Sequence, residues 1–144
     1  MPRTIKCILC AVALVAAFAA ALAITMTVRE KVPNGLYCGS YASGLLVGNL
    51  SVRYDLHLFD LSLRGLGMDL NCKDEVFTYD LKTHKLVAVS AKDPFDCIGS
   101  VIQKSGLHLE TTYNPTVDVI TLNFGIAKID CKKCRALSYL QPAL

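Results

Sequence analysis

The sequence predicts an α+β domain, predominantly antiparallel β-sheet with one helix, that follows an N-terminal hydrophobic segment. Three observations support this. Apolar and polar residues alternate with period two over much of residues 35–134, a stretch near residues 94–104 has helical spacing, and residues 7–28 carry no charge. We expect roughly seven to nine strands, arranged as a curved sheet or a small barrel.

The N-terminal segment has the features of a targeting sequence. Arg3 and Lys6 precede the uncharged apolar run, and Ala21-Leu22-Ala23 has the small-x-small pattern of a signal peptidase site. We therefore predict a signal peptide over residues 1–23 and a domain in the secretory pathway, either secreted or at the cell surface. Because about 20 apolar residues can span a bilayer, an uncleaved signal anchor that reaches about residue 28 is the alternative.

Removal of residues 1–23 leaves 121 residues, enough for a single domain with its own core. The segment carries two of the 15 cationic residues and none of the 12 acidic ones, so the remaining domain is close to neutral. This balance gives no electrostatic indication of a nucleic-acid partner. We expect the domain to cover residues 35–134, and residues 135–144 to form a loose C-terminal tail.

The cysteines predict disulfide bonds. Cys7 and Cys10 belong to the N-terminal segment, and five remain in the domain: Cys38, Cys72, Cys97, Cys131 and Cys134. Thiols spread over a small secreted domain are mostly paired, but the sequence does not determine which thiols pair. Because five is odd, one cysteine is left over, and it is free, forms a covalent dimer with a second chain or carries a modification.

The first clear strand pattern runs from Leu50 to Leu58, where even positions are apolar and odd positions are polar. It places Asn49, in the N-glycosylation sequence Asn49-Leu50-Ser51, on the solvent face. From Phe59 onward the odd positions become apolar. A change of phase of this kind predicts a β-bulge or a sharp bend.

The rest of the chain continues the alternating pattern. We expect a turn at Lys73-Asp74, a strand over residues 76–81, a hairpin loop over residues 82–85 and a return strand over residues 86–90. Alternation over residues 107–113 is followed by a turn at Asn114-Pro115. Residues 117–128 then form one long strand or two, and Asp118 shares its face with the apolar Ile120, Leu122 and Phe124.

The expected helix is marked by its end signals. Asp93 would be the N-cap, Pro94 the first helical residue and Asp96 an acid in the first turn. Gly106 would end the helix. The apolar residues from Ile98 to Ile102 should then pack on the sheet.

Cys131-Lys132-Lys133-Cys134 is the most conspicuous chemical motif. A redox CxxC lies at the start of a helix, and no convincing helix follows here. We therefore expect both thiols to belong to disulfides that tie the C-terminus to the sheet, and a bond to Cys38 would join the two ends of the domain. His57, His84 and His108 share no metal-binding spacing, and we predict no metal, cofactor or catalytic residue.

Three segments resemble small secreted proteins of kinetoplastid parasites: Gly35–Gly39, Asp96–Gly99 and Asp118–Lys128. This resemblance implies no site residues. At the level of fold, the run of amphipathic strands is similar to lipocalin-type barrels, although the Gly-x-Trp start of that family is missing. We expect a non-enzymatic binding domain for an apolar small molecule or a protein partner. The alternatives are a membrane-tethered surface protein and a thiol-disulfide oxidoreductase acting through the CxxC.

Overall fold

The computed structural model describes residues 3–25 and 30–135. The chain divides into two units, residues 1–30 and 31–144, which we describe separately. The first unit contains helix α1 (Arg3–Thr25), which covers most of the predicted signal peptide and continues two residues past its predicted end. Among the described residues, no helix has the length and apolarity needed to cross a bilayer. The end of the predicted anchor and residues 136–144 of the predicted tail lie outside the described part of the chain.

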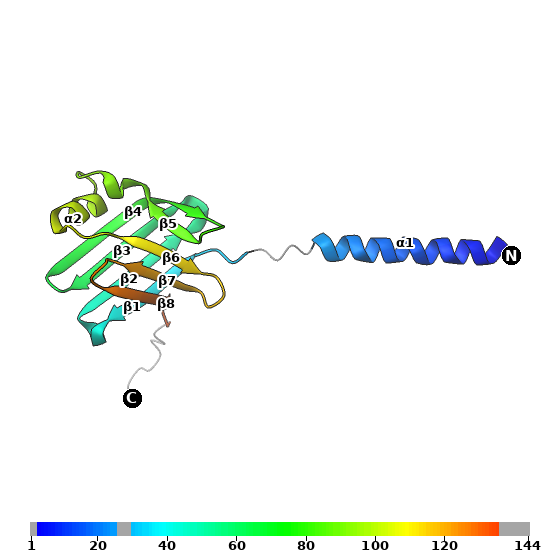
Figure 1. The fold of residues 1–144 in the computed structure, drawn as a ribbon, viewed down its shortest axis with the longest axis horizontal. Coiled ribbons are helices and arrows are strands. Elements are labelled where there is room, and N and C mark those ends of the chain that lie inside the picture. The colour runs from blue at the N-terminus through cyan, green and yellow to red at the C-terminus, as the bar shows by residue number, and fades with distance from the viewer. Residues whose placement is uncertain (1–2, 26–29, 136–144) are drawn as a thin grey trace, which may run out of the picture. The chain divides into compact units, whose positions relative to one another are not determined.

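The second unit is a closed antiparallel barrel whose strands follow one another in sequence order, with β1 pairing to β8 (Figure 1). This confirms the small barrel among the predicted arrangements. The strands are β1 (Gly35–Tyr41), β2 (Leu46–Arg53), β3 (Leu58–Gly65), β4 (Met68–Asp80), β5 (Lys85–Ala88), β6 (Glu110–Asn114), β7 (Val119–Asn123) and β8 (Lys128–Lys133).

The barrel interior is the hydrophobic core. Because side chains alternate between the two faces of a strand, each strand contributes every second residue to it. The most deeply buried side chains come from strands all around the barrel and include Tyr37, Leu46, Leu61, Phe77, Ile120 and Ile129. A Cβ at Gly39 would lie 2.6 Å from the carbonyl oxygen of Asp130 on β8. Glycine at this position therefore allows β1 and β8 to approach closely.

The phase change near Leu58 is a turn rather than the predicted bulge or bend within a strand. β2 ends at Arg53, the short 3₁₀ helix η2 (Tyr54–Leu56) follows, and His57 has a left-handed backbone with φ of 54°. The chain then reverses into β3. The predicted strand Leu50–Leu58 is therefore two strands and a turn, because a short turn can preserve the alternation of residue types that marks a strand.

The predicted turn at Lys73-Asp74 is a β-bulge inside the long strand β4. Phe59 pairs with Glu75 and Leu61 pairs with Cys72, so β4 carries one extra residue between them. Asp74 accommodates the irregularity with a positive φ of 56°. An aspartate adopts this conformation more readily than most residues, which explains why the strand can continue through it.

The predicted helix exists but begins later, as α2 (Cys97–Ser105). Asp96 is the N-cap and accepts a hydrogen bond from the Ile98 N–H at 3.2 Å, whereas Asp93 accepts from the Phe95 N–H at 2.9 Å. Asp93-Pro94 therefore forms a local turn before the helix. Gly106 ends the helix with φ of 64°, as predicted. With α1 included, the described residues form two α-helices rather than the single one expected.

One connection between strands differs from all the others. Residues 89–109 join β5 to β6 and contain the 3₁₀ helix η3 (Val89–Lys92) and α2, whereas each other connection has at most four residues, including η1 (Ala42–Gly44). Both η3 and α2 contact β4, and Figure 1 shows α2 on the β4 side of the barrel. Long connections in small domains commonly serve a function. The surroundings of this segment are therefore a candidate region for a binding site.

Candidate binding site

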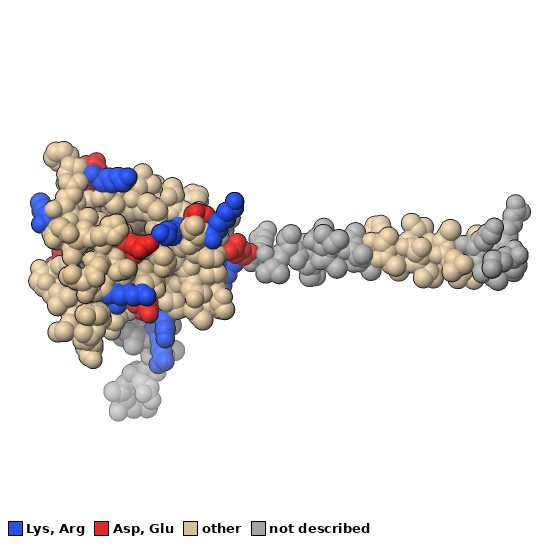
Figure 2. Space-filling model, in the orientation of Figure 1, with Lys and Arg blue, Asp and Glu red and all other residues tan. Residues whose placement is uncertain are grey.

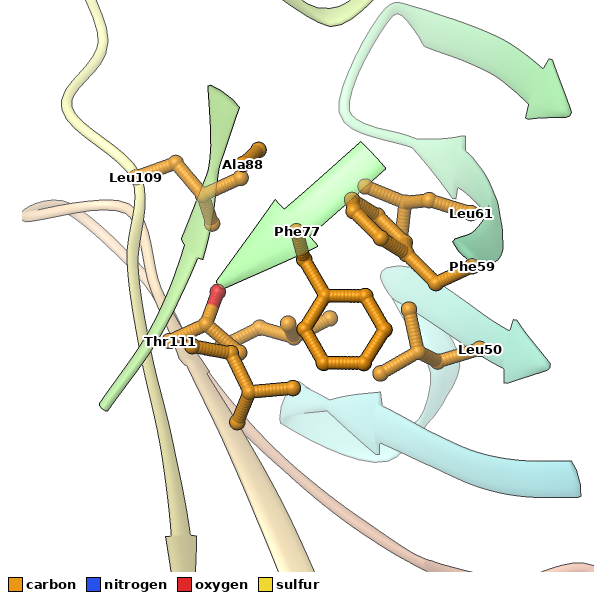
Figure 3. A pocket seen from close by; sticks show the side chains of 9 residues that line it. Leu50, Phe59, Leu61, Phe77, Ala88, Leu109 and Thr111 are labelled. Carbon is orange, nitrogen blue, oxygen red and sulfur yellow. The ribbon is translucent and has the colours of Figure 1, made fainter. Parts of the chain in front are cut away.

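The barrel encloses a small apolar cavity of about 20 Å³. In Figure 3 the ring of Phe77 lies between Ala88, Leu109 and Thr111 on one side and residues of β2 and β3 on the other. The full lining is Leu50, Phe59, Leu61, Phe77, Leu86, Ala88, Leu109, Thr111 and Leu122. Thr111 supplies its only polar side chain.

A groove of about 290 Å³ opens on the outside of the barrel between β5 and β6. The two strands pair only at Lys85↔Thr112 and Leu86↔Thr111. Ala88 continues to pair with Phe77 on β4, so β5 extends past the point where β6 has left it. The groove therefore lies where the β5–β6 ladder stops.

The groove and the interior cavity share part of their walls. Leu86, Ala88, Leu109 and Thr111 line both. A second void of about 10 Å³ lies under α2 and shares Leu61 and Leu109 with the cavity. The three spaces are therefore neighbours, and only apolar side chains and Thr111 separate them.

Charged side chains lie only at the outer rim of these spaces. Lys85 Nζ is 2.7 Å from Glu110 Oε1 across the β5–β6 opening, and the exposed His108 is nearby. The hydrogen bond and charge of Lys85 lower the pKa of the Glu110 carboxyl, and the same contact raises the pKa of Lys85. The ion pair thus connects the two strands where their ladder is shortest.

The beginning of the 89–109 connection is fixed to β4. A disulfide joins Cys72 to Cys97, with 5.6 Å between their Cα atoms, and Ser90 Oγ donates to Glu75 Oε2 at 2.8 Å. Burial and the neighbouring Asp96 raise the pKa of the Glu75 carboxyl. Burial acts to raise the pKa of Asp96 as well. Hydrogen bonds from Ser90 and Glu75 outweigh burial and lower this pKa. The Cys72–Cys97 disulfide and the Ser90–Glu75 hydrogen bond hold the start of α2 and η3 in place.

The same cluster has the residue types of a metal site. Potential ligand atoms of Cys72, Glu75 and Cys97 lie within 4.8 Å of one another. The two sulfur atoms are bonded to each other, however, and a disulfide offers no thiolate to a metal. In this form the cluster is a structural connection between β4 and α2.

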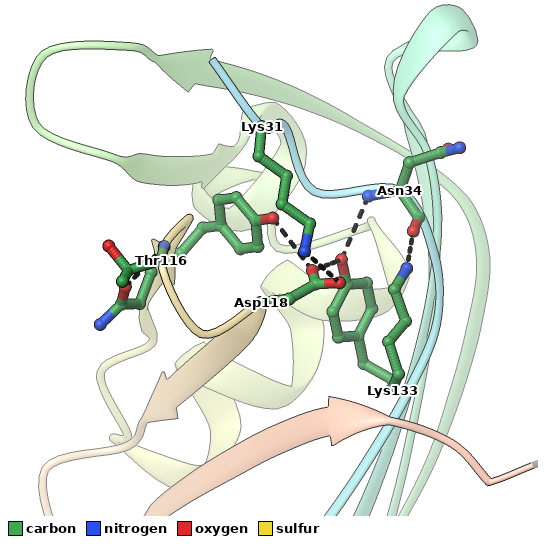
Figure 4. Close-up of polar contacts among 8 residues, drawn as sticks. Lys31, Asn34, Thr116, Asp118 and Lys133 are labelled. Carbon is green, nitrogen blue, oxygen red and sulfur yellow. Dashed lines mark hydrogen bonds and ion pairs between the residues drawn. The ribbon is translucent and has the colours of Figure 1, made fainter. Parts of the chain in front are cut away.

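A second polar cluster closes the barrel near the start of β1 (Figure 4). Tyr37 and Tyr113 donate hydrogen bonds to Asp118 Oδ1 at 2.7 and 2.9 Å, and Lys31 lies 3.2 Å from Asp118 Oδ2. Lys133 lies over the Tyr37 ring and binds the carbonyl oxygen of Asn34. The cluster therefore ties β1, β6, β8 and the chain before β1 together.

The ionisation of this cluster follows from its contacts. Burial and the hydrogen bond to the Asp118 carboxylate raise the pKa of both Tyr37 and Tyr113. Burial acts to raise the pKa of Asp118 as well, but hydrogen bonds from the two tyrosines and Lys31 outweigh it and lower this pKa. At neutral pH the cluster is therefore two neutral phenols around one carboxylate.

The structure pairs four of the five predicted disulfide candidates. Cys38 is bonded to Cys134 and Cys72 to Cys97, so the expected bond between the two ends of the domain is confirmed. The expectation that both CxxC thiols form disulfides is wrong for Cys131, which is a free thiol with no exposed surface. Burial raises its pKa to about 11. The two CxxC thiols are thus not bonded to each other. A covalent dimer through Cys131 would require the barrel to open.

Asn49 lies on the exposed outer face of β2, as the alternation indicates. Its glycosylation stays a prediction. Of the three histidines, His108 alone borders the groove, a position that sequence reasoning did not identify. Basic and acidic side chains are interspersed on the face shown in Figure 2.

No family model, curated protein or solved structure matches this chain.

Proposed function

We propose that the domain is a binding protein for an apolar small molecule that enters the barrel between β5 and β6. The observation that carries this proposal is the wall shared by the groove and the cavity, formed by Leu86, Ala88, Leu109 and Thr111. Eight-stranded barrels are wide enough either to be filled by side chains or to hold one small ligand. The incomplete β5–β6 ladder favours access from the side of the barrel.

The volumes indicate how binding would occur. A cavity of about 20 Å³ has room for little more than one water molecule, whereas the groove of about 290 Å³ is near the lower end of small-molecule pockets. A ligand must therefore displace side chains to pass inward. Leucine side chains such as Leu86 and Leu109 can change rotamer without breaking a hydrogen bond. Each methylene group that the ligand buries contributes about 0.8 kcal/mol to binding.

The environment that we propose is extracytoplasmic. Two disulfides indicate an oxidising, secretory-type compartment. Whether the domain is released or stays attached through residues 1–28 depends on cleavage. N-terminal sequencing of the protein purified from its own cells would decide this, because an intact Met1 would contradict release by a signal peptidase.

Titration with N-phenyl-naphthylamine, whose fluorescence rises in apolar surroundings, tests the binding function. We expect saturable binding to the wild-type domain. Ala88→Leu should weaken it at least about tenfold, because Ala88 lines the groove and the added carbons fill part of the space that the reporter would occupy. Val76→Leu also introduces a leucine, on the exposed outer face of β4 and away from the groove, and serves as the control. Absence of binding to the wild type, or equal loss in both variants, would contradict the proposal.

A further inference from the structure

We infer that the ligand is a single-chain amphiphile, whose alkyl chain passes from the groove through the cavity toward α2 while its polar head stays at the Lys85–Glu110 rim. This inference rests on the proposed binding function and adds the chemical class of the ligand. Three features support it: the alignment of the spaces, their width and the distribution of polar groups.

The three spaces form one path. Leu109 lines the groove, the interior cavity and the void under α2, and Leu61 lines the last two. The innermost space is bounded by α2 and by the β3–β4 end of the barrel, with Met68, Ile98 and Phe124 in its wall. Rotation of Leu109 and Leu61 would join the spaces into a continuous apolar channel. The path therefore has its mouth at the β5–β6 groove, and Met68, Leu70, Val101 and Ser105 separate its inner end from a groove on the surface beside α2.

The width of the path favours a chain over a ring. The cavity and the inner void measure about 20 and 10 Å³, and each admits roughly one water-sized group at a time. An apolar cavity that accepts benzene has about 150 Å³. An alkyl chain presents one methylene at a time, so small rotations of neighbouring leucines can admit it. A planar ring system such as a naphthalene can lie in the groove of about 290 Å³, but several side chains would have to move together before it could pass further inward.

The polar groups fix the direction of the ligand. Within the described residues, Lys85, His108 and Glu110 border the groove, whereas the inner two spaces have only hydroxyl groups, those of Thr111 and Ser105. Burial of a charged or strongly polar head among apolar side chains is unfavourable unless it is paired. The head therefore stays at the rim, where Lys85 and His108 can meet a carboxylate and Glu110 can accept from a hydroxyl.

Competition against bound N-phenyl-naphthylamine tests the chain. We expect dodecanoate and dodecanol to displace the reporter, and octanoate to bind at least about tenfold more weakly than dodecanoate because it buries fewer methylenes. Naphthalene should compete at least about tenfold more weakly than dodecanoate, because it occupies the groove alone and buries no methylenes further inward. If naphthalene competes well and the chains do not, the inference is wrong while the proposed function stands. If the reporter itself does not bind, the proposed function fails first.

Two variants test the inner end of the path. Met68→Trp fills the void under α2 from β4, and Ser105→Leu fills it from the helix, so that one remains informative if the other does not fold. Each should remove the advantage of dodecanoate over octanoate and leave octanoate affinity unchanged. Unchanged selectivity in a folded variant, checked by circular dichroism, would show that the chain does not reach α2.

Lys85→Ala tests the position of the head. It should weaken dodecanoate severalfold and leave dodecanol unchanged, because only the carboxylate gains from the ammonium group. An equal effect on both ligands, or no effect on either, would place the head elsewhere and overturn this part of the inference.

Discussion

The two shortest ladders of the barrel, β1–β8 and β5–β6, differ in what supports them. Each has only two register pairs. The β1–β8 seam is reinforced by the Cys38–Cys134 disulfide, by the Asp118 cluster and by the close approach at Gly39. The β5–β6 seam has the exposed Lys85–Glu110 pair and one further backbone bond, from the Tyr113 N–H to the His84 carbonyl.

The comparison shows how one barrel can be firmly closed and still have a way in. The β1–β8 seam joins segments far apart in sequence, and covalent and buried polar contacts offset the entropy lost on closure. The β5–β6 seam borders the long 89–109 connection, and few contacts oppose its local opening. Regions of this kind open at lower free energy than the rest of a domain.

The largest expected effect comes from breaking the covalent part of the β1–β8 seam. Cys38→Ala with Cys134→Ala should lower the free energy of unfolding by about 4.7 kcal/mol, because the bond closes a loop with a sequence separation of 96. The corresponding Cys72→Ala, Cys97→Ala double variant should cost about 3.5 kcal/mol for its separation of 25. Urea denaturation without reductant measures both. A larger loss of unfolding free energy in the Cys72/Cys97 variant than in the Cys38/Cys134 variant would contradict the prediction. It would show that the entropy of the unfolded chain is not the main source of disulfide stabilisation.

Removal of the carboxylate of the Asp118 cluster should have the next largest effect. Asp118→Ala leaves the hydroxyls of Tyr37 and Tyr113 without their acceptor, at a cost of about 2–4 kcal/mol. Lys31→Ala removes a half-exposed partner of the same carboxylate and should cost less than about 1 kcal/mol. If chemical denaturation shows similar losses for the two variants, the buried tyrosines do not depend on Asp118.

The same cluster predicts two limits to stability on the pH scale. The pKa of Asp118 is lower in the folded state than its unfolded value near 4, so the ionised carboxylate stabilises the fold above about pH 4. This stabilisation is lost as the pH falls through the folded-state pKa. The pKa values of Tyr37 and Tyr113 are raised in the folded state, so their neutral phenols stabilise the fold below about pH 10. This stabilisation is lost as the pH rises further and the phenols ionise. Melting temperatures across the pH range should show a plateau, and Tyr37→Phe should flatten its alkaline side. An unchanged alkaline limb would contradict this.

The smallest effect on stability is expected at the β5–β6 seam. Glu110→Ala removes an exposed ion pair, so the melting temperature should change little. The rate of uptake of N-phenyl-naphthylamine should rise, because the pair connects the two strands at the mouth of the groove. Stopped-flow fluorescence measures this rate, and Glu30→Ala, far from the groove in sequence, serves as a control. A slower rate in Glu110→Ala would argue against access at this seam.

Much of the barrel could be predicted because alternation depends on local sequence. The apolar face of Leu50 and Val52 was predicted correctly, and the hairpin loop after β4 was predicted one residue late, at 82–85 instead of 81–84. Positions such as His57 and Asp74 were not, since a left-handed residue that is not glycine leaves the alternation almost undisturbed. The start of α2 was misplaced because Asp93 and Asp96 are both suitable caps, and only the tertiary contacts select Asp96.

The candidate site was harder to predict than the fold. The groove exists because a ladder ends after Leu86, and the pairing of strands leaves no local mark in sequence. The Asp118 cluster did leave a signal: an acid on the apolar face shared with Ile120 and Leu122. Its partners Tyr37 and Tyr113 lie on other strands, so their convergence depends on the closed barrel.

The Cys38–Cys134 bond also determines how the domain responds to mechanical tension. Both ends of the chain leave the barrel beside this bond, since β1 begins at Gly35 and β8 ends at Lys133. A pull on the two termini would pass through residues 35–37, the sulfur bridge and Cys134. The residues between Cys38 and Cys134, whose sequence separation is 96, lie outside this force path. Only the first residues of β1 would therefore carry load, and the strands between Cys38 and Cys134 would be shielded from it.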